Sequence, residues 1–593
     1  MEYVSEAVGD VVLNEFGFKS LTPVQQATIP QFLGHCDVAV EACTGSGKTL
    51  AFVMPVFEML IRAAKEEDHV DEDDEKKKKR KKNPPGHWGA VIISPTRELA
   101  QQIFNVAQPF CKALDMHSII LTGGGNVGED LETVQTQTID LVIGTPGRLN
   151  DVMERAQSML KFKNFQVLVL DEADVLLDMG FEKTVTSILR RLPKQRRTGL
   201  FSATQTKEVK ALIRAGLRNP AVISVQVQMD SSKRQRQTPT TLDNLYLVCE
   251  PTDKLRILCE LIHDKKDQKL LVFFSTCASV DFFSKALNLL IPETVSVVTS
   301  LHGKMPQKKR MRTYDTFAKK QGGGVLLVTD VAARGIDIPD VDLIVQFDPP
   351  QDPSFFVHRV GRTARAGRDG RALVFLLPAE LAYVNLLESR KVPMQKYPGF
   401  EELAERKRYA NCLEKIRKEV FKDRDLLEKG TKAFIAFLRS YKEHKCPFIF
   451  KLSDLKMSAI AESFVLLRLP KVKELRETKG IKGFEAVDTQ TVAKIPFKDK
   501  QREKQRQANY LVLQKKQKEE EEAAKASKKR KAPKADDKKP EKKAQPKRRN
   551  KGIQQAIYEE WDTLATEERL YKNFKKGKIS KEEYERLSNE IDF

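Results

Sequence analysis

The sequence predicts an α/β protein with two α/β domains in tandem, followed by a helical C-terminal unit and a basic tail. Its 593 residues exceed what one hydrophobic core usually holds, so about three structural units are expected. Short apolar runs alternate with helix-length segments over residues 37–201 and again over 244–377. Near-continuous apolar runs with such connections are typical of buried parallel strands and crossover helices.

The first domain is expected over residues 1–228. Its apolar runs, each predicted to form a strand, are DVAVEA, AVIISPT, SIILTGG, DLVIGTP, VLVLDEAD and GLFSAT. A charged segment, KEEDHVDEDDEKKKKRKKNPPG, interrupts this pattern. Blocks of like charge cannot bury enough apolar surface to fold, so residues 65–87 are predicted to be a disordered surface insertion.

The second domain is expected over residues 244–395, with strands at NLYLVCE, LLVFFST, VSVVTSLHG, VLLVTD, LIVQFDPP and ALVFLLP. Residues 229–243 between the domains are polar and aperiodic, as in a flexible linker. Apolar residues at three-to-four spacing predict a helical C-terminal extension over 405–470. Residues 498–593 are rich in Lys, Arg, Glu, Gln and Ala, which indicates a basic, largely disordered and partly helical tail.

The composition narrows the class of protein. A formal net charge of +21 favours a polyanionic partner, with nucleic acid ahead of an anionic membrane because no basic amphipathic anchor is evident. The eight cysteines form no C-x-x-C pair, which argues against a zinc site or a disulfide framework and favours a reducing compartment. No apolar run approaches the ~18 residues that cross a bilayer, and the N-terminus lacks signal-peptide features. A soluble intracellular protein without a membrane partner is expected.

The segment ACTGSGKT follows a predicted strand and precedes an apolar helix. This is the context of a phosphate-binding loop, where backbone N–H groups and the helix N-terminus surround phosphates, Lys48 reaches the outer phosphates and Thr49 holds Mg²⁺. The predicted nucleotide-binding loop consists of Ala42, Cys43, Thr44, Gly45, Ser46, Gly47, Lys48 and Thr49. The general pattern has glycine where Ala42 stands, and a chance glycine-rich turn is the alternative interpretation.

Three carboxylates follow the apolar run VLVL. Because an ionised acid is costly to desolvate without a partner, Asp171, Glu172 and Asp174 need a cation, a metal or a reaction, unless the stretch is a solvated acidic loop. Beside a phosphate loop, Asp171 can bind Mg²⁺ directly or through water, and Glu172 can act as general base on the attacking water. Asp174 is assigned to a link with Ser202 and Thr204 of the SAT motif, or with the second domain.

Eight motifs occur in order between residues 17 and 365: GFKSLTPVQ, ACTGSGKT, PTRELA, TPGR, DEAD, SAT, TDVAARGIDIP and HRVGRTAR. Together they resemble the DEAD-box family of ATP-dependent RNA helicases. The resemblance implies two tandem RecA-like parallel-sheet domains, ATP and Mg²⁺ as cofactors, and hydrolysis of ATP to ADP and phosphate coupled to local unwinding of RNA. It also implies that ATP and RNA both favour a closed arrangement of the two domains.

The resemblance implies roles at the adenosine. Gln25 is similar to the glutamine that reads the adenine edge, where an amide can both donate and accept. Phe18 is placed to pack near the base, and Asp337 near the ribose. The family usually has a further aromatic residue upstream, which this sequence does not supply. Weaker stacking, use of Tyr3, or a truncated start are the alternatives.

In the second domain, Arg362 and Arg365 are similar to the family's arginine fingers. Their planar forks suit the charge on the transferring γ-phosphoryl oxygens. The alternative is an exposed, salt-bridged cluster. His358 is expected to contact the acidic loop of the first domain.

The resemblance also implies a path for one RNA strand along residues that approach phosphates and sugars without reading bases, so binding is expected to be independent of sequence. These residues are Pro95, Thr96, Arg97, Glu98, Gly123, Gly124, Thr145, Gly147 and Arg148 in the first domain, and Ser275, Thr276, Gln307, Arg310, Thr329, Arg334 and Gly335 in the second.

The sequence from KGTKAFIAFLRSYKEH to IPFKDKQREKQRQ resembles the C-terminal extension of the family's members that act in large-ribosomal-subunit assembly. This implies rRNA within pre-60S particles as the partner and nuclear, nucleolar localisation, in keeping with the KKKKRKK and KKRK runs, although such runs are also typical of solvated charge. A monomer is expected, and the need for a protein activator is open. An RNA-binding scaffold with a vestigial ATPase and a DNA-directed motor are the competing hypotheses.

Overall fold

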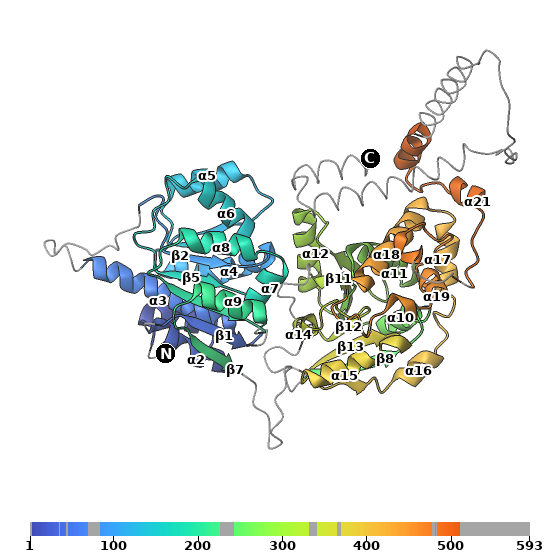
Figure 1. The fold of residues 1–593 in the computed structure, drawn as a ribbon, viewed down its shortest axis with the longest axis horizontal. Helices are drawn as coiled ribbons and strands as arrows, with labels where there is room; N and C mark the ends of the chain where they lie inside the picture. The colour runs from blue at the N-terminus through green and yellow to red at the C-terminus, as the bar shows by residue number, and fades with distance from the viewer. Residues whose placement is uncertain are drawn as a thin grey trace, which may run out of the picture. The chain divides into compact units, whose positions relative to one another are not determined.

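The computed structural model describes residues 3–34, 36–42, 45–68, 84–204, 206–225, 242–330, 341–363, 369–476, 481 and 483–509. The chain divides into two compact units. The first contains two parallel sheets and comprises residues 1–250, 257–408 and 440–451. The second comprises 251–256, 409–439 and the described residues from 452 onward, and it is helical (Figure 1). None of the helices in these ranges is long and apolar enough to span a membrane.

The first sheet has seven strands in the order β3-β4-β2-β5-β6-β1-β7, and neighbouring strands run parallel. The strands are β1 (Val38–Ala42), β2 (Ala90–Ile93), β3 (Ser118–Leu121), β4 (Leu141–Gly144), β5 (Val167–Leu170), β6 (Arg197–Ser202) and β7 (Ala221–Val225). The six predicted runs all form strands. The seventh, β7, was not predicted; its residues AVISV form a short edge strand in which partly buried and exposed residues alternate.

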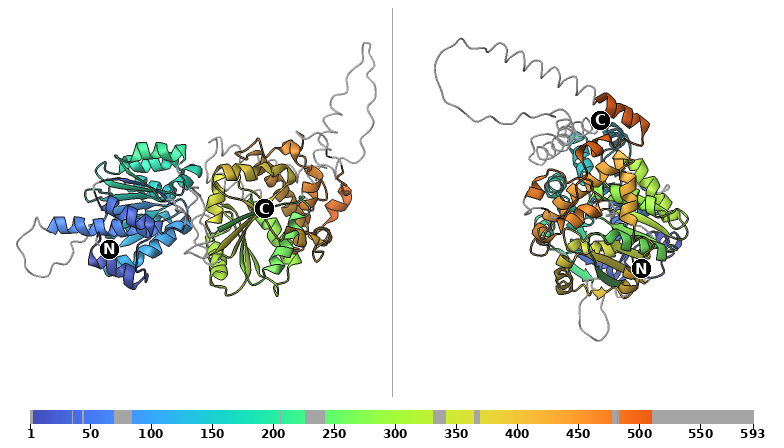
Figure 2. Two further views of the ribbon diagram at one scale, coloured as in Figure 1. Left: turned by 90° about the horizontal axis from the view of Figure 1, so that it is seen from below. Right: turned by 90° about the vertical axis from the view of Figure 1, so that its right-hand side faces the viewer.

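Helices cover both faces of this sheet (Figure 2). Successive strand residues point to opposite faces, so Val38 and Val40 join one apolar core while Ala39 joins the other. The helices are α1 (Glu6–Asn14), α2 (Pro23–Leu33), α3 (Lys48–Asp68), α4 (Arg97–Ala113), α5 (Val127–Thr136), α6 (Pro146–Arg155), α7 (Ala173–Asp178), α8 (Glu182–Arg191) and α9 (Lys207–Gly216).

The second sheet also has seven parallel strands, in the order β10-β11-β9-β12-β13-β8-β14. Its strands are β8 (Leu242–Val248), β9 (Lys269–Phe273), β10 (Val298–Leu301), β11 (Gly324–Val328), β12 (Leu343–Gln346), β13 (Gly370–Leu376) and β14 (Gln395–Lys396). Its helices are α10 (Lys254–Asp264), α11 (Cys277–Leu290), α12 (Gln307–Lys319), α14 (Ser354–Val360), α15 (Ala382–Ser389) and α16 (Phe400–Glu405). The predicted fold class is therefore confirmed: two parallel-sheet domains and a helical C-terminal region.

Two predicted boundaries change. Helix α3 continues through Asp68, so residues 65–68 are helical and do not belong to a disordered insertion. At the other end Pro84 and Gly86 are described, and His87 forms a parallel bridge with Lys161. Strand β8 begins at Leu242, inside the predicted 229–243 linker. The rest of the insertion and of the linker lies outside the described residues.

The second unit is built around α18 (Arg424–Lys442), whose apolar face is buried. Phe434 of α18 packs edge to face on Phe464, with ring centroids 6.1 Å apart. The remaining helices are α17 (Cys412–Val420), α19 (Met457–Ser463), α20 (Lys473–Arg476) and α21 (Thr489–Lys494). The predicted helical extension is thus present, and three-to-four spacing marked it correctly.

The chain after α21 packs against the start of α18. The carbonyl of Pro496 accepts a hydrogen bond from the Arg424 N–H at 2.8 Å, and Ile495 is buried. Arg502 Nη1 donates to Asp425 Oδ1 at 2.6 Å. Residues 500–509 form a helix. The predicted disorder is therefore wrong for residues 498–509, and residues 510–593 lie outside the described residues.

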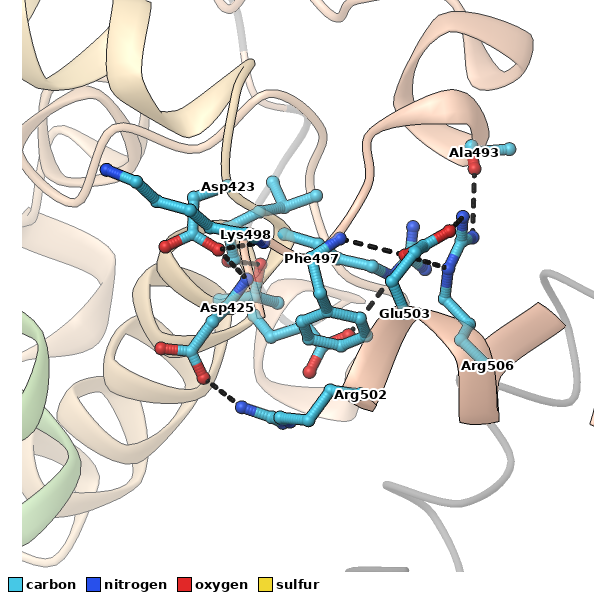
Figure 3. A network of polar contacts seen from close by, with 12 residues as sticks. Asp423, Asp425, Ala493, Phe497, Lys498, Arg502, Glu503 and Arg506 are labelled. Carbon is cyan, nitrogen blue, oxygen red and sulfur yellow. Dashed lines mark hydrogen bonds and ion pairs between the residues drawn. The ribbon is translucent and has the colours of Figure 1, made fainter. Parts of the chain in front are cut away.

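Polar contacts hold this segment, which we call the tail anchor (residues 495–509), in place (Figure 3). The Arg502 guanidinium lies 4.5 Å from the ring centroid of Phe497. Glu503 accepts hydrogen bonds from the Phe497 N–H at 2.9 Å and from Arg506 Nη2 at 2.8 Å. The hydrogen bond from Arg506 is the main cause that lowers the pKa of Glu503 to about 2. Charge pairing, rather than apolar burial, orders this helix, so composition alone indicated disorder.

Reversing the charge of Arg502 should loosen the tail anchor. Arg502→Glu places like charges together opposite Asp425, and an exposed ion pair contributes roughly up to 1 kcal/mol, so amide exchange over residues 495–509 should become several-fold faster. Hydrogen-exchange mass spectrometry measures this. Lys504→Glu, on the exposed side of the same helix, is the matched control, and adding Asp425→Arg should restore slow exchange. Equal exchange in the Arg502 and Lys504 variants would contradict the anchor.

Candidate active site

The phosphate loop connects the end of β1 to the first turn of α3. Gly45 and Gly47 have φ values of +81° and +93°, in the left-handed region that favours glycine. A Cβ on Gly47 would lie 2.7 Å from Gln25 Nε2 and 2.9 Å from Thr22 Oγ1, so a side chain does not fit. Of the predicted loop, Cys43 and Thr44 lie outside the described residues.

Lys48 and Thr49 begin α3, so their side chains lie at the helix N-terminus, where anions are favoured. Lys48 is buried, and its Nζ donates to the Ala42 carbonyl at 2.6 Å, across the loop. Gln25 is also tied to the loop: its Nε2 donates to the Gly47 carbonyl at 3.1 Å. Its Oε1 accepts from the Thr22 N–H at 2.9 Å. The predicted adenine-reading amide is thus fixed against the loop backbone.

The aromatic residues near the N-terminus are only partly placed for a base. Phe18 is half-exposed and stacks on Phe16 with ring centroids 6.3 Å apart. Tyr3 lies elsewhere: its carbonyl accepts from Arg62 Nη2 at 3.1 Å. Arg62 is 14 residues beyond Lys48 along α3, about 21 Å at 1.5 Å per residue. The hydrogen bond ties the Tyr3 backbone to a part of α3 distant from Lys48, and stacking of Tyr3 on the base stays a prediction.

Asp171 and Glu172 lie at the end of β5, both buried. Burial, and then the charge of Glu172, raise the pKa of Asp171 to about 7, while the Lys48 ammonium acts in the opposite direction. Glu172 has a φ of +44°, an uncommon value for a residue with a side chain. Its Oε2 is buried and accepts no hydrogen bond from the residues that the structure describes. A buried pair of acids with an open oxygen fits a divalent cation and a water, and Thr49 supplies a hydroxyl from the loop.

Asp174 is held by a different set of groups. Thr204 donates twice to its Oδ2, from N at 3.0 Å and from Oγ1 at 2.8 Å, and Ser202 Oγ donates to the Thr204 carbonyl at 2.8 Å. His358 Nε2 lies 3.3 Å from the same oxygen. Burial opposes ionisation, but the charge and hydrogen bond of His358 and the bond from Thr204 hold the pKa of Asp174 well below its usual range. These four predicted coupling residues are therefore brought together.

Arg359, beside His358, was not predicted. Its guanidinium is almost fully buried and donates to both oxygens of Asp330, at 2.6 and 2.8 Å. It also donates to the Asp348 carbonyl at 2.7 Å and lies 4.9 Å from the Phe273 ring centroid. The positive charge of Arg359 is thus balanced by Asp330, within the second domain. The motif HRVGRTAR indicated roles for Arg362 and Arg365 but none for Arg359. Arg362 is buried, and Arg365 lies outside the described residues.

The predicted RNA residues of the first domain divide into two sets. Arg97 spreads over the backbone of Gly123 and Gly124, where a Cβ on Gly124 would lie 2.5 Å from Arg97 Nη1. Thr96 caps α4, and a Cβ on Gly147 would meet open space. Other members are engaged within the protein. Arg148 pairs with Asp130 and donates to the Gly125 carbonyl at 2.7 Å, so it braces the loop before α5. Glu98 lies 2.8 Å from Arg310 Nη2.

In the second domain the predicted RNA residues surround the N-termini of α11 and α12. Ser275 donates through N and Oγ to Asp348 Oδ2, at 3.1 and 3.0 Å. Thr276 caps α11 by accepting from the Ser279 N–H at 3.0 Å. Thr329 is buried. In the first domain, Pro95 directly precedes Thr96, the N-cap of α4, and Thr145 is the N-cap of α6. Among the residues predicted in the second domain, Arg334, Gly335 and Asp337 lie outside the described residues, as Arg365 does.

Comparisons with known proteins agree with this architecture. Residues 22–212 match the DEAD/DEAH box helicase family, residues 253–367 match the helicase conserved C-terminal domain, and residues 423–472 match the C-terminal extension of the SPB4-like ATP-dependent rRNA helicases. The two helicase matches cover the phosphate loop, the acidic cluster and α14. The third covers α18 and α19 and stops before the tail anchor.

Individual relatives cover most of the chain. ATP-dependent RNA helicase DDX55 of Danio rerio is 44% identical over 588 residues, or 98% of this chain and 94% of the relative. DEAD-box ATP-dependent RNA helicase 18 of Arabidopsis thaliana is 46% identical over 501 residues, or 83% of this chain and 80% of the relative. The solved structure of Mss116p bound to ssRNA and AMP-PNP is similar with a TM-score of 0.65 and 26% identity, over 80% of this chain and 92% of that one.

Substituting Gly47 should weaken nucleotide binding. Gly47→Ala adds a Cβ at 2.7 Å from Gln25 Nε2 and forces an alanine into a left-handed φ, so the loop must shift away from Gln25. We expect ATP affinity to fall by at least about tenfold because loop geometry and backbone N–H groups set phosphate binding. Fluorescent ATP titration measures this. Gly125→Ala, whose Cβ would meet open space, is the control, and equal affinity in the two variants would contradict the assigned geometry.

Proposed function

The chain belongs to the DEAD-box family of ATP-dependent RNA helicases, and from that premise we propose that it remodels rRNA within pre-60S particles during large-subunit assembly. The ATPase and helicase activities follow from the family. The assembly role is supported by one observation above the others, the match of residues 423–472 to the SPB4-like C-terminal extension, which follows the second helicase domain in the chain. The relatives named DDX55 carry the same whole-chain arrangement.

The proposed ATP site uses the phosphate loop and the acidic pair. Lys48 would contact the outer phosphates, and Thr49 and Asp171 would hold Mg²⁺, directly or through water; the bound ion would neutralise phosphate charge. Glu172 orients and deprotonates the attacking water, because its Oε2 is buried and accepts no hydrogen bond from the described residues. Arg362 and Arg365 stabilise the charge that develops on the γ-phosphoryl oxygens. Gln25 and Phe18 contact adenine and Asp337 the ribose; the products are ADP and phosphate.

Coupling between ATP and RNA is proposed to pass through Asp174. Its oxygen binds Thr204 of the SAT motif and His358 of the motif that carries the arginine fingers. One carboxylate thus contacts both the strand beside the phosphate loop and the helix before Arg362. ATP and RNA then favour the same arrangement of the two domains, and each tightens binding of the other by an equal factor. Bending of the bound strand on closure separates a short duplex, and hydrolysis reverses it.

The proposed RNA surface reads backbone rather than sequence. Its members are glycines, hydroxyl residues and helix starts, which approach phosphates and sugars closely. Thr96 and Thr276 cap the N-termini of α4 and α11, where anions are favoured, and Arg97 places a guanidinium beside Gly123 and Gly124, so these residues suit contacts with phosphates. Arg148 supports the surface indirectly, through Asp130. Selection of an rRNA site then falls to the extension and the tail.

The basic tail is proposed to hold rRNA by nonspecific phosphate contacts, and its KKRK run, with KKKKRKK, to direct the protein to the nucleus and nucleolus. We propose that the protein acts as a monomer. Two other functions predict different results. An RNA-binding scaffold with a vestigial ATPase would gain support if Lys48→Ala fully sustained ribosome assembly. A DNA-directed motor would gain support if DNA stimulated hydrolysis as well as RNA does.

Glu172→Gln should abolish ATP turnover and leave nucleotide binding intact. The amide keeps the size of the side chain but cannot accept the water's proton, so turnover should fall by about 10²-fold or more while the affinity for ATP stays within about threefold. Steady-state phosphate release and ATP titration measure the two quantities. Glu182→Gln, on the exposed first turn of α8, is the matched control. Turnover equal to that control would remove Glu172 from the mechanism.

Two truncated chains test what the basic tail and the tail anchor contribute to RNA binding. A chain ending at residue 509 keeps the anchor; a chain ending at residue 487 loses both. Both should bind single-stranded RNA more weakly, with a shallower dependence of log Kd on log salt, because fewer phosphates are neutralised. ATP hydrolysis at saturating RNA should persist. Fluorescence anisotropy at several salt concentrations measures the slope, and an unchanged slope in the chain ending at 509 would mean that the tail binds protein.

A further inference from the structure

Strand β10 forms one edge of the second sheet. It pairs with β11 on one side, and no other strand in the described parts of the chain lies beside it. The carbonyl of Val297 accepts from the Val325 N–H at 3.0 Å, so odd-numbered residues direct their backbone groups to β11. Parallel pairing alternates these directions. The N–H and C=O groups of Val298 and Ser300 therefore point away from the sheet.

A cavity of about 650 Å³ lies against β10. Residues from α11, β10 and α12 line it, so it contacts the edge strand and both flanking helices. Its rim carries three cations on α12 and no acid: Lys308, Lys309 and Arg312. Hydroxyl residues complete the wall, among them Thr299 and Thr313. The surface therefore combines outward-pointing N–H and C=O groups of β10, a concave shape and positive charge.

We propose that this surface, the β10 edge, docks an acidic protein segment that adds to the sheet as an extra strand. An extended segment can pair with the outward backbone groups of Val298 and Ser300, as peptides do in β-strand addition. Four strand residues span about 13 Å. Acidic side chains on such a segment would meet Lys308 and Arg312, which lie one turn apart on α12.

The features favour a peptide over RNA. RNA offers no backbone N–H groups to continue a parallel or antiparallel ladder, whereas a peptide satisfies both donors and acceptors of an edge strand. The proposed RNA residue Arg310 lies on another side of α12, about 200° around the helix from Lys308 and Arg312, and it pairs with Glu98. Lys308 and Arg312 therefore face away from Arg310. Met305 and Pro306, which also line the cavity, directly precede the proposed RNA residue Gln307, so competition with RNA distinguishes the two ligands.

Anisotropy with a labelled eight-residue peptide, in which Glu or Asp alternates with Val, tests the proposal on the full-length protein. Binding should fall at least about tenfold with a peptide N-methylated at alternate backbone nitrogens, and likewise in a Lys308→Glu, Arg312→Glu variant. A peptide with Lys in place of the acids should not bind. Lys319→Glu, at the end of the same helix, should change affinity by less than about twofold. Unfolding temperatures of both variants confirm that they fold.

Three results would overturn the proposal. Equal binding of the N-methylated peptide would mean that charge alone, without strand addition, holds the ligand. Single-stranded RNA that displaces the peptide and loses affinity in the Lys308 and Arg312 variant would assign the surface to the RNA path. Failure of the acidic peptide to bind would leave the lysines as protection of an edge strand against aggregation. None of these results bears on ATP hydrolysis, so the proposed function is tested separately.

Discussion

Three carboxylates within four residues of the end of β5 are the constraint on which the site depends. Each is buried, and each is stabilised in a different way. Asp171 lies beside the Lys48 ammonium and has a raised pKa; Asp174 has two donors from Thr204 and the His358 ring. Glu172 keeps an oxygen without a hydrogen bond among the described residues. An acid with a raised pKa, an acid with a lowered pKa and an acid with an open oxygen are thus set side by side, which suits three different tasks.

The parallel sheets supply this arrangement. Strands β1 and β5 flank β6 in the sheet, so the phosphate loop after β1, the acids after β5 and the SAT motif after β6 all lie at the carboxyl ends of adjacent strands. Ligands in open parallel sheets bind at this edge. The second sheet repeats the plan with Ser275, Thr329 and Asp348 after its central strands, and the buried fork of Arg359 joins two of those loops through Asp330 and Asp348.

Much of this could be predicted from the sequence, because buried parallel strands are continuous apolar runs and the phosphate loop has a local spacing. The features that the sequence did not predict depend on contacts with residues distant in the chain. β7 is a short edge strand, and the helix of the tail anchor is mostly exposed and is held by polar contacts that include the ion pair of Arg502 with Asp425 of α18. Arg148 was assigned to RNA from its motif, yet its guanidinium is occupied by Asp130. The contact between the Tyr3 carbonyl and Arg62 likewise joins residues that are distant in the sequence. Domain limits and site roles stay predictions.

The central claim is that ATP hydrolysis is coupled to RNA through residues that contact both domains. Steady-state hydrolysis by the full-length protein, without nucleic acid, with single-stranded RNA and with DNA of the same sequence, tests it most directly. The account predicts strong stimulation by RNA and weak stimulation by DNA, because 2′-hydroxyl contacts discriminate the two. Hydrolysis that is equally fast without nucleic acid, or equally stimulated by DNA, would contradict it.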